Sequence, residues 1–184
     1  MRDTIETKRL KLRSLRLSDA QRVAALCGEP SVARMILRAP LPYLPIAAEG
    51  WILTLAARKR LAEEFVYAVD LEGEGLIGVV GAHKAGENTF EVGYWFGRPY
   101  WGRGFATEAL NAFVPDASTL GPLQAGHFID NPASGRVLQK GGFTYTGEIA
   151  NLFSLARGAK APTKRMRYAG ERELGFGLRE AQVA

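Results

Sequence analysis

The sequence is poor in cysteine and histidine, and it contains no long hydrophobic run. Its single cysteine, Cys27, excludes an intramolecular disulfide. The two histidines, His83 and His127, have no Cys, His or Asp partner at the spacing of metal ligands, so we expect no metal site. No apolar run approaches the ~18 residues that a membrane-spanning helix needs. The sequence therefore predicts neither a disulfide scaffold, nor a metalloprotein, nor a membrane protein.

The composition is that of an ordinary folded protein. The 184 residues predict a single domain over residues 1–184, with 47% hydrophobic and 23% charged residues. A formal net charge of +5 favours encounters with anions. Because the basic residues are spread along the chain, we do not expect nucleic acid as a partner. Residues 1–6 are charged and lack the apolar stretch of a signal peptide, so we expect a cytoplasmic protein.

Hydrophobic periodicity predicts alternating strands and helices. Ser18 and Gln21 form a capping-box pattern at the start of a helix, and a second helix runs through Trp51. A third helix begins just after Gly104, and Pro115 is expected to end it early. Strands are expected at residues 9–13, 65–69, 76–82, 89–96 and 123–129, followed by a helix from Asn131 to Lys140. This order predicts a mixed α/β sandwich.

A glycine-rich turn joins the strand at residues 89–96 to the helix after Gly104. Gly102 and Gly104 lack Cβ atoms, so a phosphate could approach the main chain closely there. The unpaired amides at the helix start would bind such an anion, and Arg103 would add positive charge. The pattern is neither a P-loop nor the G-x-G-x-x-G fingerprint of dinucleotide-binding folds. On spacing alone, a tight turn without a ligand remains an equal alternative.

Three motifs together resemble a known family. Residues 91–96 (Glu-Val-Gly-Tyr-Trp-Phe) and 100–109 (Tyr-Trp-Gly-Arg-Gly-Phe-Ala-Thr-Glu-Ala) resemble the acetyl-CoA site of GNAT-superfamily N-acetyltransferases. Residues 131–143 and 7–13 resemble the subgroup named for ribosomal-protein N-acetyltransferases (RimJ/RimL-like). The resemblance implies the GNAT fold, an α/β (α+β) architecture in which helices flank a mixed, mostly antiparallel central sheet.

The resemblance also implies an activity. Acetyl-CoA would donate its acetyl group to a primary amine, either a protein N-terminus or a small molecule, by direct attack in a ternary complex. No metal is implied, and a homodimer is left open. One alternative is a non-catalytic acyl-CoA-binding or sensing module of the same fold. Another is a basic RNA-associated protein, but the sequence does not display the aromatic and basic surface that it would need.

The resemblance places the contacts to acetyl-CoA on three stretches. The pyrophosphate loop would comprise Gly102, Arg103, Gly104, Phe105, Ala106 and Thr107. The main chain of Tyr94, Trp95 and Phe96 would pair with the pantetheine arm, while the Tyr94 and Phe96 side chains could simply be core. Asn131 and Arg136 would also contact the cofactor, although helix capping and solvation explain them equally well. Pro115 departs from the family pattern because it is expected to shorten the helix after the loop.

Acetyl transfer requires that the acceptor amine lose a proton, because amine pKa values lie near ~8 or ~10.4. Glu91 is the candidate base, since it interrupts an apolar strand. The alternative is a strand-face charge paired with a Lys or Arg. Ser134 is the candidate acid that protonates the departing thiolate, with a local hydrogen bond as its alternative role and Tyr145 as a rival acid. A main-chain amide of the strand would stabilise the oxyanion.

Overall fold

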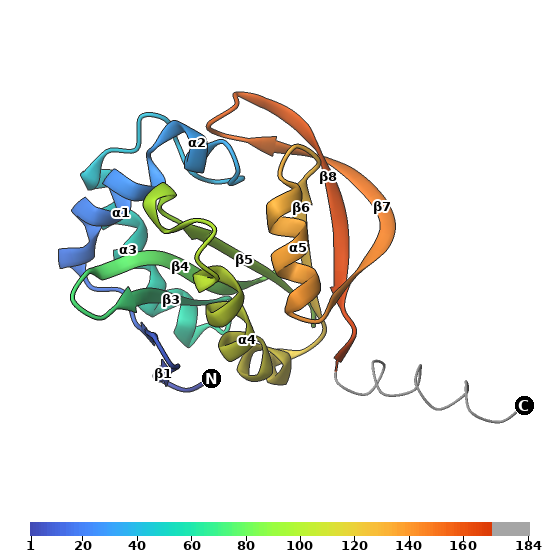
Figure 1. Ribbon diagram of the computed structural model, residues 1–184, viewed down its shortest axis with the longest axis horizontal. Helices are drawn as coiled ribbons and strands as arrows, with labels where there is room; N and C mark the ends of the chain where they lie inside the picture. Colours follow the sequence, from blue (N-terminus) through green and yellow to red (C-terminus); the bar gives the residue numbers. More distant parts are fainter. Residues whose placement is uncertain (171–184) are drawn as a thin grey trace, which may run out of the picture.

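A computed structural model describes residues 1–170, and eight strands form its single sheet (Figure 1). The predicted domain also covers residues 171–184, which lie outside the described residues. The strands are β1 (Thr4–Glu6), β2 (Leu10–Arg13), β3 (Glu64–Leu71), β4 (Gly75–Lys84), β5 (Phe90–Phe96), β6 (Leu123–Phe128), β7 (Phe143–Ser154) and β8 (Ala159–Tyr168). The helices are α1 (Ala20–Cys27), α2 (Pro30–Ala33), α3 (Pro45–Arg60), α4 (Phe105–Ala117) and α5 (Pro132–Lys140).

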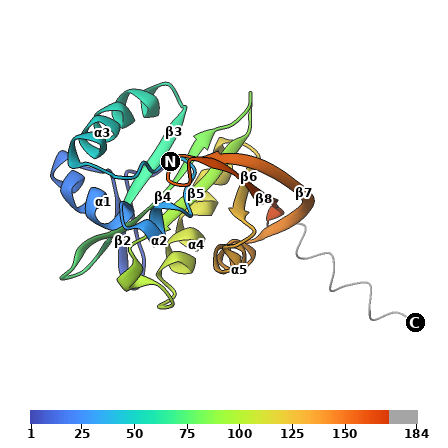
Figure 2. The ribbon, with the colours of Figure 1, turned by 90° about the horizontal axis from the view of Figure 1, so that it is seen from above.

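The strand order is β1-β2-β3-β4-β5-β6-β8-β7, and all neighbours are antiparallel except β5 and β6. Helices α1 and α3 lie on one face of the sheet, whereas α4 and α5 cover the other (Figure 2). Because both faces are covered, β4 reads as a nearly continuous apolar run and not as an alternating one. The predicted α/β architecture with a mixed, mostly antiparallel sheet flanked by helices is confirmed.

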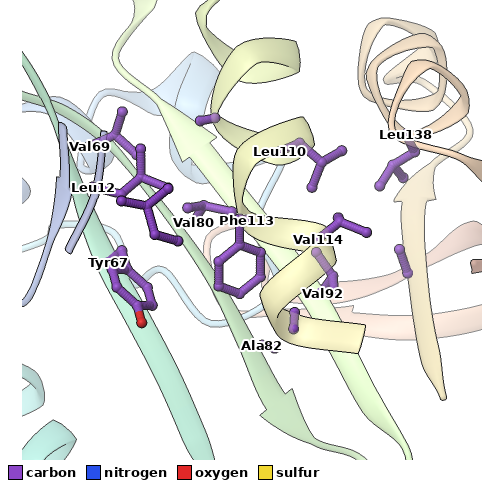
Figure 3. Close-up of a cluster of buried hydrophobic side chains, with 14 of the residues drawn as sticks. Leu12, Tyr67, Val69, Val80, Ala82, Val92, Leu110, Phe113, Val114 and Leu138 are labelled. Atoms are coloured by element: carbon purple, nitrogen blue, oxygen red, sulfur yellow. The ribbon is translucent and has the colours of Figure 1, made fainter. Parts of the chain in front are cut away.

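The larger core lies between α4 and the sheet (Figure 3). Phe113 and Val114 of α4 point at the sheet, where Val80 and Val92 meet them. The Phe113 ring also packs edge-on against Tyr67, with 5.8 Å between the ring centroids. This packing fixes α4 against β3, β4 and β5, and therefore fixes the position of the loop that precedes α4.

The two parallel strands separate soon after they meet. β5 and β6 pair at only three positions, from Phe90 with Leu123 to Val92 with Ala125. Beyond Val92, residues 93–96 of β5 have no strand partner on the β6 side, although β4 pairs with the other edge of β5 throughout. The divergence is visible in Figure 1. It leaves an unpaired strand edge inside the molecule, which is uncommon because such edges readily accept another extended chain.

The predicted capping box at Ser18 and Gln21 is wrong. A 3₁₀ turn (Leu17–Asp19) precedes α1, and the Asp19 carboxylate accepts a hydrogen bond of 2.8 Å from the Arg16 amide. Asp19 also forms an ion pair of 2.7 Å with Arg13 of β2. The tertiary contact with Arg13 therefore sets the start of this helix, and local sequence alone did not reveal it.

The expectation that Pro115 ends α4 early is also wrong. The helix continues to Ala117 with Pro115 in its last turn. Proline removes one hydrogen bond to the carbonyl four residues earlier, which belongs to Asn111. Asn111 is exposed, so water can replace the lost donor. The helix after the glycine-rich turn therefore keeps a length of 13 residues.

Candidate active site

A large cavity opens where β5 and β6 separate. Its volume is about 980 Å³, at the upper end of the range of roughly 300–1,000 Å³ for small-molecule and cofactor sites. All but one of the thirteen predicted site residues line it: Glu91, Tyr94, Trp95, Phe96, Gly102, Gly104, Phe105, Ala106, Thr107, Asn131, Ser134 and Arg136. The exception is Arg103, whose guanidinium lies 4.8 Å from the centroid of the Phe105 ring. The structure thus gathers residues from three distant sequence motifs around one space.

The glycine-rich turn presents main-chain donors to this cavity. Gly102 and Gly104 have φ angles of +73° and +81°, a backbone conformation that favours glycine. The first hydrogen bond of α4 runs from the Glu108 amide to the Gly104 carbonyl, at 3.0 Å. The amides of residues 105–107 therefore have no acceptor within the helix. Together with the positive end of the helix dipole they form a site for a phosphate or diphosphate.

Contacts from the segment between β1 and β2 hold this loop in place. The Glu108 carboxylate accepts hydrogen bonds from the Thr7 hydroxyl (2.7 Å) and from the Arg9 main chain (2.9 Å) and side chain (2.7 Å). Arg9 also donates to the Arg103 carbonyl at 3.1 Å. Burial alone would raise the pKa of Glu108, but the hydrogen bonds from Thr7 and Arg9 outweigh it and lower that pKa. Glu108 is a positioning residue that the sequence analysis missed.

The unpaired edge of β5 continues from this loop into the cavity. Phe96 is buried in the core, and Trp95 packs on the α1 and α3 side of the sheet. The Trp101 indole donates a hydrogen bond of 2.7 Å to the Phe96 carbonyl and so ties the loop to the end of the strand. A β5 residue can pack its side chain in the core while its main-chain N–H and C=O groups face the open edge of the sheet. The two are compatible because side chains point above and below a sheet, whereas the main-chain groups point along its plane.

Tyr94 and Ser134 meet across the cavity. The Tyr94 hydroxyl lies 2.8 Å from the Ser134 hydroxyl and donates to the Ser134 carbonyl at 3.0 Å. Burial raises the pKa of Tyr94, so its phenol is neutral near pH 7. The Asn131 side chain caps α5 by accepting a hydrogen bond of 3.2 Å from the Ser134 amide. The capping expected for Asn131 is therefore present, and its side-chain nitrogen retains the capacity to donate.

Glu91 faces the α1 and α3 side of the cavity as half of an ion pair. Arg165 of β8 donates to its two carboxylate oxygens at 2.8 and 2.5 Å, and both side chains are less than 15% exposed. The hydrogen bond to Glu91 raises the pKa of the Arg165 guanidinium. The alternative role of Glu91, a strand-face charge paired with a Lys or Arg, therefore has a partner in Arg165. Each carboxylate oxygen can accept more than one hydrogen bond, so the pair leaves room for a water or an amine.

Tyr145 lies away from the cavity. Its hydroxyl is 3.0 Å from Nε2 of His127, and Nδ1 of His127 is 2.8 Å from the Phe128 carbonyl. Because a carbonyl only accepts, Nδ1 carries the hydrogen and Nε2 accepts from Tyr145. Gly135 allows this contact, since a Cβ there would lie 2.5 Å from the Tyr145 oxygen. The structure therefore brings Ser134, and not Tyr145, to the cavity.

The far end of the cavity, on the α1 and α3 side, carries further charged groups that the sequence analysis did not assign. Arg38 follows α2, and His83 of β4 lies directly opposite Glu91 in the sheet register. Burial first, and then the nearby Arg38 guanidinium, lower the pKa of His83. The alternation of side chains along β4 and β5 does not by itself place His83 and Glu91 on the same face of the sheet. That inference also needs the pairing register of the two strands, which the sequence did not reveal. We call this part of the cavity, lined by Arg38, Glu64, His83 and Glu91, the acceptor end.

Residues 1–170 contain neither a reactive thiol nor a cluster of metal-ligating side chains. Burial raises the pKa of the Cys27 thiol to about 12, so it stays protonated near pH 7. Within residues 1–170, no group of three or more His, Cys, Asp or Glu side chains could hold a metal ion. None of the helices in that part of the chain is both long and apolar enough to cross a membrane.

Comparisons with known proteins all give acetyltransferases. The family described as acetyltransferase (GNAT) domain matches residues 9–144. The chain is 30% identical over 151 residues to the uncharacterized N-acetyltransferase YoaA of Bacillus subtilis (strain 168), a match that covers 79% of this chain and 85% of YoaA.

Two solved structures share the fold. RimL, a ribosomal L7/L12 alpha-N-protein acetyltransferase in complex with coenzyme A, matches with a TM-score of 0.77 and 17% identity, over 89% of this chain and 96% of that chain. MccE, the microcin C7 self-immunity acetyltransferase in complex with acetyl-CoA and AMP, matches with a TM-score of 0.75 and 16% identity, over 88% and 92%.

Proposed function

Because this chain belongs to the GNAT family of acetyltransferases, we propose that it transfers the acetyl group of acetyl-CoA to a primary amine on a small molecule or at a protein N-terminus. The observation that carries the proposal is the continuity of the cavity. A row of free main-chain amides at the start of α4 leads to the unpaired edge of β5, which ends beside Glu91 and Ser134. The similarity to RimL favours the RimJ/RimL-like subgroup.

The residues of the cavity fit coenzyme A. The amides of residues 105–107 would bind the diphosphate, and Gly102 and Gly104 leave room for it. The β5 edge at residues 93–96 would pair with the amide groups of the pantetheine arm, as an added strand does. Arg136 lines the cavity and forms no ion pair within residues 1–170, so it is available for a phosphate. Asn131 would donate with its side-chain nitrogen.

The proposed reaction is direct attack of the amine on the thioester. Glu91, directly or through a water, accepts the proton that the ammonium group loses, and the amine nitrogen then attacks the thioester carbon. A β5 amide stabilises the oxyanion while the new C–N bond forms. When the C–S bond breaks, the Ser134 hydroxyl donates its proton to the thiolate, and the second proton that the amine nitrogen loses on becoming an amide returns to the Ser134 oxygen, directly or through water. The Tyr94 hydroxyl at 2.8 Å orients Ser134, and Glu91 passes its proton to solvent.

Release of free thiol from acetyl-CoA, measured over a panel of amines, tests the proposal. We expect turnover with at least one primary amine and none with Gly104→Val, because valine strains a backbone with a φ of +81° and crowds the diphosphate. Isothermal titration should show that Gly104→Val loses affinity for coenzyme A. Tight coenzyme A binding without thiol release from any amine would instead support the sensing module. Unchanged affinity in a folded Gly104→Val variant would refute the loop assignment.

A further inference from the structure

The acceptor end of the cavity carries an unbalanced positive charge. Its two carboxylates are already neutralised, since Glu64 pairs with Arg58 at 3.1 Å and Glu91 pairs with Arg165 at 2.8 Å. Arg38 lines the same cavity, yet its guanidinium forms no ion pair or side-chain hydrogen bond within residues 1–170. One cation therefore faces this space without a protein counter-ion.

His83 does not change this balance. Burial and the Arg38 charge lower its pKa below the usual value near ~6.5, so its imidazole is neutral at pH 7. It adds neither a second cation nor an anion to the acceptor end. The remaining charge is that of Arg38 alone.

The chain around Arg38 is fixed by the β7–β8 hairpin, which reaches over toward α2 (Figure 1). The Leu155 amide donates to the Leu37 carbonyl at 2.9 Å, and the Ser154 hydroxyl donates to the Ile36 carbonyl at 3.0 Å. Arg157 donates to the Arg34 carbonyl at 2.7 Å. After Arg38 the chain enters the core at Ala39, which is 3% exposed. The segment that carries Arg38 is thus held by hydrogen bonds before this residue and by burial of the residue after it.

We propose that the acceptor is a primary amine that also carries a carboxylate, and that Arg38 binds this carboxylate while the amine reaches Glu91. The inference rests on the proposed N-acetyltransferase function and specifies its substrate class. A guanidinium binds a carboxylate through two parallel hydrogen bonds, and no carboxylate of residues 1–170 pairs with Arg38. A polyamine would instead bring further ammonium groups toward Arg38, where Glu64 and Glu91 are already paired. A free acidic amino acid and a peptide with acidic residues near its N-terminus share the required chemistry.

Acceptor selectivity measured by thiol release at saturating acetyl-CoA tests this inference. The probes are three C-terminally amidated peptides, Ala-Glu-Glu-Ala, Ala-Gln-Gln-Ala and Ala-Lys-Lys-Ala, and a second set of free glutamate and glutamine amide, which has no carboxylate. We expect kcat/KM to favour the acidic probe within each set by roughly tenfold or more, the effect of one charge-assisted hydrogen-bonded pair. The two sets separate a free amino acid from a peptide as the source of the carboxylate.

Arg38→Gln should remove the preference for acidic probes, and Arg38→Glu should reverse it toward the basic peptide. Both variants should bind coenzyme A like the wild type, because Arg38 lies at the opposite end from the α4 loop. Arg60→Glu, an exposed arginine at the end of α3 that does not line the cavity, changes the net charge equally and should leave selectivity unchanged. If the wild type turns over neutral or basic probes as fast as acidic probes, or faster, the inference of an acidic acceptor is overturned but the proposed acetyltransferase function is not. No turnover of any amine overturns the proposed function as well.

Discussion

The Glu91–Arg165 pair joins two strands that are distant in sequence and places a charge beside the open edge of β5. Both side chains are mostly buried, so neither ion can be removed without leaving the other in a poorly solvated position. A single substitution therefore mixes two effects, loss of a proton acceptor and loss of an ion pair. Separating them requires a double substitution.

Glu91→Gln should lower kcat by roughly 10²-fold or more, because glutamine cannot accept the proton of the acceptor ammonium. The affinity for coenzyme A should change little, since the proposed diphosphate and pantetheine sites lie on the α4 loop and the β5 main chain. Steady-state kinetics between pH 6 and pH 9 and calorimetric titration with coenzyme A measure the two quantities.

The control is the pair Arg165→Met and Glu91→Gln/Arg165→Met. If Glu91 serves only as the partner of Arg165, replacing both should restore stability and activity, because removing a whole buried ion pair is often neutral. If Glu91 is the base, the double variant should recover its melting temperature but not its kcat. Recovery of kcat in the double variant would contradict the catalytic role.

At the scale of single elements, the start of α4 matters most. Its main-chain amides are the proposed anion site, and the segment between β1 and β2 contacts this loop through the hydrogen bonds of Thr7 and Arg9 to Glu108. The Arg9 guanidinium also lies 4.4 Å from the centroid of the Phe105 ring, the first residue of the helix. The N-terminal segment thus supports the proposed cofactor site.

Glu108→Ala should weaken coenzyme A binding by about 3- to 10-fold, the effect expected when one or two hydrogen bonds that order the loop are lost. At saturating acetyl-CoA, kcat should stay close to that of the wild type, because Glu108 does not reach the reacting atoms. Titration calorimetry and steady-state kinetics measure both. Glu72→Ala, in the exposed turn between β3 and β4, removes the same charge as a control. An unchanged dissociation constant would show that the loop holds itself in place.

Several elements could be predicted from the sequence because their signals are local. The β3–β4 hairpin and α5, with Asn131 as its cap, follow from turn residues and capping chemistry that act within a few positions. The start of α1 and the end of α4 could not be predicted in this way. An ion pair to β2 sets the first, and the exposed position of Asn111 lets the helix continue past Pro115 at the second.

At the scale of the whole molecule, the fold creates the site by bringing together residues that are distant in sequence. The motifs that carry Gly104, Glu91 and Ser134 were recognisable along the chain. The sequence did not contain the register that sets His83 opposite Glu91, the pairing of Arg165 with Glu91, or the packing that brings Arg38 to the same cavity. Those residues have no motif of their own, because each reaches its position through contacts between elements that are distant in sequence. The stretches proposed to bind the cofactor could therefore be named from the sequence, whereas the acceptor end could not.

The ion pairs that join distant elements should make the stability of the molecule depend on pH. Burial raises the pKa of Asp19, but its hydrogen bonds from Arg13 and the Arg16 amide outweigh burial and lower that pKa. The hydrogen bond from Arg157 likewise lowers the pKa of Asp130. A carboxylate whose pKa is lower in the folded state contributes its stability above the unfolded value of ~3.9 and loses it as the pH falls through the folded value. His83 has the same sign, because its lowered pKa means that the unfolded chain binds its proton first, below about pH 6.5.

We therefore expect the free energy of unfolding in urea to be level above pH 7, to decline slightly between pH 6.5 and pH 5 through His83, and to fall steeply below pH 4 through the carboxylates. Urea titrations from pH 3 to pH 8, followed by circular dichroism, measure this profile. His83→Gln should remove the first decline and leave the second, whereas Asp19→Asn should lower stability at pH 7 and flatten the acid limb. A free energy of unfolding that stays constant from pH 5 to pH 3 would show that the ion pairs of Asp19 and Asp130 do not stabilise the folded chain.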